Sequence, residues 1–148
     1  MESLLYNDVI TVYNRYTIGL PPFSSREVFD RAVIKGVHYE TDVDKNPDSQ
    51  GKATISQTVL ILIPKGADQG GKIYLPPNEY NRISVDNNKY WTLDTRDENK
   101  TFIIRGVGRE ISAMYSIEQL QKDGGVLVKG VSDMLDSKVL PHLEIRCI

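Results

Sequence analysis

The sequence predicts a mainly β protein: a compact β-barrel or sandwich with one short helix in its C-terminal half and long polar loops. Three observations lead to this prediction. Short runs rich in β-branched and aromatic residues recur along the chain. Clusters of Gly, Pro, Asn and Asp separate these runs at regular intervals. One segment alone combines a capping residue in front with a glycine stop behind, which is the signature of a helix.

The first half of the chain contains three predicted strands. The first covers Asp8 to Tyr13, and the second covers Phe29 to Tyr39, with Gly36 marking a bulge or bend inside it. The third runs from Thr54 to Ile63. It alternates at first and then becomes fully apolar, which is typical of a strand whose end is buried on both faces, and Pro64 stops it.

Two polar segments are predicted to be exposed, flexible loops. Residues 42–52 include Asn-Pro-Asp-Ser-Gln-Gly and almost no apolar side chain, so they have little to bury. Residues 66–71 read Gly-Ala-Asp-Gln-Gly-Gly, which is typical of a turn. We therefore expect a single β-rich domain over residues 1–148, with flexible loops at 42–52 and 66–71.

Shorter elements are predicted in the middle of the chain. Ile73 to Leu75 is a candidate edge strand, and Pro77 to Arg82 can form one helical turn that starts near its proline. Strands are expected at Tyr90 to Leu93 and at Thr101 to Val107. The charged stretch 94–100 would join these two strands as a hairpin loop.

The predicted helix runs from Ile117 to Lys122. Ser116 can cap its amide groups, Gln119 completes a capping box, and Gly124-Gly125 ends it. The last two predicted strands are Val126 to Val131 and Leu143 to Ile148.

A pattern of apolar, basic, Gly and Val residues occurs three times. It is found at Ile34 to Val37, Ile104 to Val107 and Val128 to Val131. A repeated strand bend that curves a barrel wall would explain it. Strands draw on few residue types, however, so chance recurrence is the simpler interpretation.

Composition and charge are those of an ordinary soluble domain. The chain has 148 residues, 40% of them hydrophobic and 26% charged, and a formal net charge of -2. This near balance argues against electrostatic binding of nucleic acid or anionic lipid over a whole face. The longest apolar run, Val59 to Ile63, is far too short to span a membrane, and the N-terminus lacks the features of a signal peptide. The single cysteine, Cys147, rules out an intramolecular disulfide, which fits folding in a reducing cytoplasm.

The motifs that suggest a ligand are incomplete. Residues 42–46 open like a calcium loop, but Pro47 holds the position that needs glycine, and Ala53 holds the position that needs a bidentate glutamate. Residues 106–108 begin like a dinucleotide fingerprint, but Ile111 replaces its third glycine. We expect no metal site and no cofactor.

Residues able to do catalysis are present but not arranged for it in the sequence. His38, His142 and Cys147 have no metal-ligand spacing, and the chain has no nucleophile elbow. Asp94 and Asp97 lie in a hydrophilic stretch, where water is expected to keep both carboxylates ionised. We therefore predict no catalytic residues and a protein that is not an enzyme.

Four aromatic residues gather in the central region: Tyr74, Tyr80, Tyr90 and Trp91. A stacking platform for sugars or single strands would need these rings on one exposed face beside basic residues. Acidic residues accompany the nearby basic ones, so core and interface packing is the favoured interpretation. A small carbohydrate- or ligand-binding module is the less favoured alternative.

Three groups of segments together resemble a known family. They are Val9 to Asn14 with Arg31 to Tyr39; Ser56 to Pro64 with Tyr90 to Leu93 and Phe102 to Gly106; and Val131 to Asp133 with Leu140 to Ile145. In these segments the chain is similar to small proteins encoded by tailed phages and prophages of Gram-positive bacteria, among the structural genes for the head–tail region.

The resemblance implies a virion component of the neck, such as a head–tail connector or head-closure (stopper) protein. Such proteins have a compact β-barrel-like core and form homo-oligomeric rings between portal and tail. The implied partners are further copies of the chain, portal or adaptor proteins and tail-terminator proteins, with DNA passing by without specific binding and no membrane involved. The expected location is the virion, after synthesis in the bacterial cytoplasm. A tail-completion or minor capsid protein is the alternative, and the resemblance carries over no catalytic residues.

Overall fold

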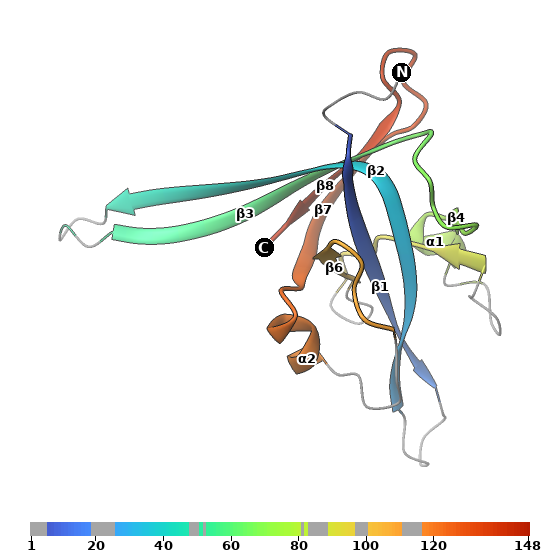
Figure 1. Ribbon diagram of the computed structural model, residues 1–148, viewed down its shortest axis with the longest axis horizontal. Helices are drawn as coiled ribbons and strands as arrows, with labels where there is room; N and C mark the ends of the chain where they lie inside the picture. The colour runs from blue at the N-terminus through green and yellow to red at the C-terminus, as the bar shows by residue number, and fades with distance from the viewer. Residues whose placement is uncertain are drawn as a thin grey trace.

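Six antiparallel strands close into a barrel in the order β1-β2-β3-β8-β7-β6 (Figure 1). The computed structural model describes residues 6–18, 26–47, 51, 53–80, 82, 89–96, 101–110 and 117–148. The barrel strands are β1 (Asp8–Ile18), β2 (Arg26–Pro47), β3 (Ala53–Pro64), β6 (Thr101–Arg105), β7 (Val126–Met134) and β8 (His142–Cys147). The prediction of a mainly β protein with a barrel core is confirmed.

Four smaller elements lie beside the barrel. β4 (Ile73–Tyr74) and β5 (Tyr90–Trp91) form a separate two-stranded parallel sheet. The two short helices are α1 (Pro77–Tyr80) and α2 (Ile117–Lys122). The predicted edge strand, helical turn and C-terminal-half helix are therefore confirmed. The predicted hairpin across 94–100 is wrong, because β5 pairs with β4, whereas β6 pairs with β1 and β7.

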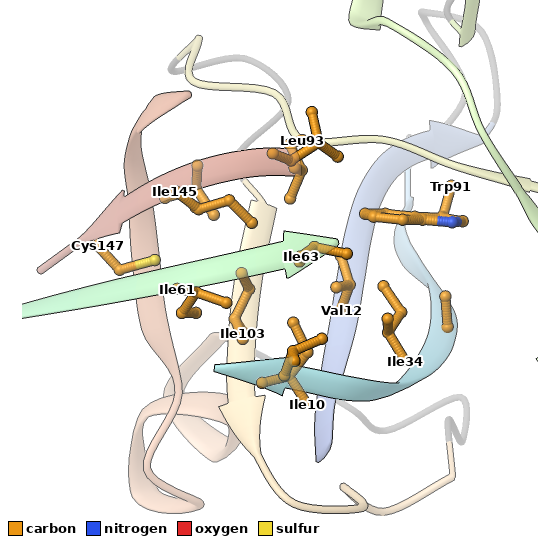
Figure 2. Close-up of a cluster of buried hydrophobic side chains, with 14 of the residues drawn as sticks. Ile10, Val12, Ile34, Ile61, Ile63, Trp91, Leu93, Ile103, Ile145 and Cys147 are labelled. Atoms are coloured by element: carbon orange, nitrogen blue, oxygen red, sulfur yellow. The ribbon is translucent and has the colours of Figure 1, made fainter. Parts of the chain in front are cut away.

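Alternate residues of the barrel strands fill the interior. Figure 2 shows side chains from β1, β2, β3, β6 and β8 gathered together, among them Ile10, Ile34, Ile61, Ile103 and Ile145, all 0% exposed. Trp91 and Leu93 belong to the same cluster although they come from outside the barrel strands. Burying side chains of this size is the main source of stability for a fold of this kind.

A second cluster packs under α2. Leu120 of this helix is fully buried among Tyr13, Phe29, Phe102 and Ile104. The rings of Phe29 and Phe102 meet edge to face, with their centroids 6.5 Å apart. The helix therefore covers apolar side chains on the opposite face of β1 and β6 from the interior cluster, since these residues alternate with the interior ones.

The repeated apolar-basic-Gly-Val pattern marks irregular points of the barrel wall. The β1–β2 register shifts beside Gly36, whose φ is 84°, and the β7–β8 register shifts just before Gly130. Gly106, with a φ of 88°, directly follows the last residue of β6. The pattern therefore recurs where strands bulge or end, as the strand-bend interpretation expects.

The prediction of a loop over 42–52 is wrong for residues 42–47. These residues continue β2 and pair with β3 in unbroken register from His38–Leu62 to Pro47–Ala53. A lack of apolar side chains does not prevent pairing, because backbone hydrogen bonds form the ladder. Residues 48–50 and 52 lie outside the described residues. The other predicted loop, 66–71, is a turn as expected, and the Asp68 backbone anchors it to Lys35 through two hydrogen bonds of 2.8 and 3.0 Å.

Candidate functional site

The most unusual feature of the structure is a two-stranded ribbon that leaves the barrel. β2 and β3 run together away from the other strands, as Figure 1 shows. We call residues 42–47 of β2 and 53–58 of β3 the arm. Its six residue pairs extend from Asp42–Thr58 to Pro47–Ala53. At about 3.4 Å per residue, the arm reaches roughly 20 Å beyond the barrel.

The arm begins beyond the last point at which either of its strands has another neighbour. β1 pairs with β2 as far as Val37, and β8 pairs with β3 as far as Val59. Val59 is buried in the interior cluster, whereas Asp42 and Thr58 are exposed. The two strands thus leave the barrel wall in turn: β2 loses its other neighbour after Val37, and β3 loses its own beyond Val59, which pairs with Thr41.

Both long edges of the arm lack a ladder partner among the described strands. β2 beyond Val37 has β3 as its sole neighbour, and β3 before Val59 has β2 as its sole neighbour. In an antiparallel pair, about half of the backbone N–H and C=O groups of each strand point away from the partner. Such an edge is a template for pairing with another chain, and an isolated hairpin has little stability in water.

The sequence of this region gives it little apolar surface. Among residues 41–58, the apolar residues are Val43, Ala53 and Ile55. An interface built here therefore depends on main-chain hydrogen bonds and polar contacts rather than on a large hydrophobic patch.

A notch of about 450 Å³ lies at the root of the arm. Val59, Leu60 and Cys147 supply apolar lining, and charged side chains of β2, β7 and β8 surround them. Among these charges, Arg146 forms an ion pair with Glu144 at 3.2 Å. Burial raises the pKa of the Cys147 thiol to about 12, so the thiol keeps its proton near neutral pH.

Each histidine has a polar contact close to it in the sequence. His38 Nε2 lies 3.8 Å from a carboxylate oxygen of Glu40, and His142 Nδ1 lies 2.6 Å from the carbonyl oxygen of Leu140. Both are local contacts within two residues of the chain. Within the described ranges, no group of three or more His, Cys, Asp or Glu residues is placed to hold a metal ion. The stretch that opens like a calcium loop is extended in β2, a conformation that does not wrap around an ion.

Two of the four central aromatic residues are buried, and the other two are half-buried. Trp91 is 1% exposed and Tyr80 is 3% exposed. The Trp91 indole donates a hydrogen bond to Gln69 Oε1 at 2.9 Å, and its ring centroid lies 5.0 Å from that of Tyr74. Burial, together with the charge of Asp133, raises the pKa of Tyr74 to about 12. Core packing of these rings, the favoured interpretation from the sequence, is confirmed for Tyr80 and Trp91.

The expectation that Asp94 is solvated is wrong. Asp94 is 2% exposed, and its carboxylate accepts hydrogen bonds from the backbone N–H and the guanidinium of Arg96 at 2.9 to 3.1 Å. An ion pair with several hydrogen bonds offsets the cost of burying the carboxylate. Asp97 lies outside the described residues.

The arm itself was missed by sequence reasoning. A signal was present, since turn-forming residues lie between two stretches of similar length that contain threonine, valine and isoleucine. Gly51, between these stretches, has a φ of 84°, which is typical of a glycine in a turn.

Comparison with known proteins gives one match. The model of a protein family of unknown function, DUF6751, matches residues 5–148. No curated protein and no solved structure matches the sequence. In the part of the chain that the structure describes, neither helix has the length and apolar character needed to cross a membrane.

Proposed function

The chain belongs to the DUF6751 family of proteins of unknown function, and we propose, from its arm and its sequence resemblance, that it is a tailed-phage virion assembly component that acts through protein–protein contacts in a homomeric ring. Its place in the virion would be the neck, as a head–tail connector or head-closure protein. In this role the protein assembles with other chains and makes or breaks no covalent bond.

One observation carries this proposal: the arm, which projects from a closed barrel with both edges unpaired among the described strands. The closed barrel makes a stiff support for the arm. A protruding hairpin on such a support costs backbone entropy and leaves strand edges unpaired, which favours a role in contacts with other chains.

The place in the virion comes from the sequence resemblance to phage head–tail proteins. The nearly neutral charge is compatible with it, because a conduit must let DNA slide rather than hold it through many phosphate contacts. The partners would be portal or adaptor proteins on one side and tail-terminator proteins on the other.

The oligomeric state tests the proposal directly. The mass of the intact chain would be measured by light scattering alone and with portal and tail-terminator proteins, and the particles would be imaged by electron microscopy. We expect rings, formed by the chain alone or on a partner ring. A strict monomer that binds neither partner would contradict the proposal. Binding to tail proteins without any affinity for the portal would instead favour a tail-completion role.

A further inference from the structure

We propose that the arms of neighbouring copies pair edge to edge, with β2 of one copy against β3 of the next, so that a ring of copies carries a continuous belt of arm strands. This inference rests on the proposed function and extends that function by naming the backbone groups that join one copy to the next. The bonds are main-chain hydrogen bonds between two different edges of the same arm.

The first step concerns which edges are available. Within the closed barrel each strand has two neighbours, although β2 pairs with β1 over Arg26–Val37 and with β3 only from His38 onward, and β4 and β5 are two residues long each. The arm carries two long strand edges that lie away from the barrel and can accept another strand. A partner can pair with either of them by strand addition, and a second copy brings the same two edges.

The second step concerns direction. Within one arm, β2 and β3 run antiparallel. When copies are related by rotation about a ring axis, their arms point the same way relative to that axis. The β2 edge of one arm then faces the β3 edge of the next, and these two strands are again antiparallel. The belt so formed continues the pairing that already exists inside each arm.

The third step concerns charge. The β2 part of the arm contains Asp42, Asp44 and Lys45, whereas the β3 part, 53–58, contains no charged residue. Two β2 edges related by a two-fold axis would bring aspartates of the two copies close together, which is unfavourable across strands. Two β3 edges would avoid this repulsion but leave both acidic edges unpaired. Pairing β2 with β3 puts the acidic edge against the uncharged one in every copy.

The fourth step concerns closure. A contact between two different surfaces of the same chain is heterologous, and it repeats until it closes into a ring or extends as a filament. Closure leaves no arm edge unpaired on any copy. The two-fold alternative leaves one edge open on each copy.

Disulfide trapping with mixtures of single-site variants tests this arrangement. One set of chains carries a cysteine on β2 and the other carries a cysteine on β3, at positions that the β2–β3 register places on one face of the ribbon. The variants are Asp42→Cys, Asp44→Cys and Asn46→Cys on β2, and Thr54→Cys, Ser56→Cys and Thr58→Cys on β3. Each β2 variant is mixed with each β3 variant, assembled, oxidised under mild conditions and analysed by mass spectrometry.

We expect the mixed β2–β3 product to be several-fold more abundant than either like–like product in at least one mixture for each β2 position. The native Cys147, at 1% exposure, stays buried, so the unsubstituted chain should give no disulfide. A matched control pairs each arm variant with Gln121→Cys on the exposed side of α2, and no excess of mixed product is expected there.

Other outcomes would overturn the pairing. A predominant β2–β2 product would indicate a two-fold dimer. Rings without an enriched arm disulfide would place the contact between copies elsewhere and would leave the proposed function unaffected. A monomer that binds neither portal nor tail-terminator proteins would contradict both the arm pairing and the proposed function. Hydrogen exchange of the unsubstituted chain gives a second measurement, since amides of 42–47 and of 53–58 should both become protected on assembly and both lose protection when the ring dissociates.

Discussion

The side-chain amide of Asn14 forms two hydrogen bonds with the backbone of Thr92. Its Nδ2 donates to the Thr92 carbonyl oxygen at 2.7 Å, and its Oδ1 accepts from the Thr92 N–H at 3.1 Å. Nδ2 also donates to Thr101 Oγ1, which accepts a further bond from the Asp94 N–H. The amide thus takes the place of a neighbouring strand and fixes residues 92–94 against β1 and β6.

Replacement of Asn14 by alanine should lower the free energy of unfolding by about 2–3 kcal/mol. The change leaves the N–H and C=O of Thr92 without partners in a buried place, because Asn14 and Thr92 are each 2% exposed. Urea denaturation followed by Trp91 fluorescence would measure the loss. Asn78→Ala, the same chemical change at an exposed position, is the control and should have little effect. Equal losses in the two variants would contradict the structural role of Asn14.

Gly36→Ala should destabilise the barrel by about 1 kcal/mol. Gly36 has a φ of 84°, a conformation that a residue with a Cβ atom adopts at a cost. The added Cβ would meet nothing closer than the Tyr6 carbonyl oxygen at 3.9 Å, so the cost is conformational rather than steric. Gly66→Ala is the control, since its φ is not positive and no atom lies within 4 Å of the added Cβ. If thermal unfolding gave the same midpoint for both variants, the bulge at Gly36 would not depend on glycine.

Cys147 should make the protein less stable at alkaline pH. Burial raises the pKa of its thiol from 9.0 to about 12. Above pH 9 the unfolded chain loses the thiol proton while the folded chain keeps it, so stability present below pH 9 is lost as the pH rises toward 12. Between pH 8 and pH 10, the native chain should lose about 1 kcal/mol more than Cys147→Ala. Urea denaturation in the presence of a reductant would measure both. The pKa of Tyr74 is also raised, but Tyr74 is present in both proteins and contributes equally to both. If the native chain and Cys147→Ala lost the same unfolding free energy, the thiol would ionise in the folded state as it does in the unfolded chain.

Trp91 fluorescence should not respond to small ligands. Trp91 is the single tryptophan, it is 1% exposed, and its indole N–H is bonded to Gln69. We expect blue-shifted emission and weak quenching by iodide, with no change on adding oligosaccharides or single-stranded oligonucleotides. The urea-unfolded chain is the control for quenching. A saturable change with either ligand would revive the ligand-binding alternative.

Strand positions could be predicted from the sequence because buried strands are built from runs of β-branched and aromatic residues. Val9 to Tyr13 and Val59 to Ile63 are such runs, and the structure places alternate residues of both segments in the interior cluster. The helix at Ile117–Lys122 could be predicted for a similar reason, since its stop signal lies in adjacent residues. A single sequence therefore reveals the strands and helices whose positions are determined by residues adjacent in the chain.

Partners far apart in the chain could not be predicted. The pairing of β5 with β4, rather than with β6, follows from Trp91 entering the barrel core and from the Asn14–Thr92 contact across 78 residues. The burial of Asp94 depends on the position of Thr101 and on its own ion pair with Arg96. The arm was missed because its strands hold each other by backbone bonds, which leave little hydrophobic pattern in the sequence.

Removal of the arm should abolish self-association and leave the barrel folded. In this variant an Asn-Gly turn replaces residues 44–56 and joins Val43 to Gln57, which are directly paired in the ribbon. The described core residues all lie outside the arm, and an isolated hairpin adds little stability, so the free energy of unfolding should stay within about 1 kcal/mol. A control variant that replaces residues 48–52 by the same turn keeps both arm strands, and it should still assemble. Unfolding of the arm-less chain would make the arm part of the folding core, and rings formed without it would place the contact between copies elsewhere.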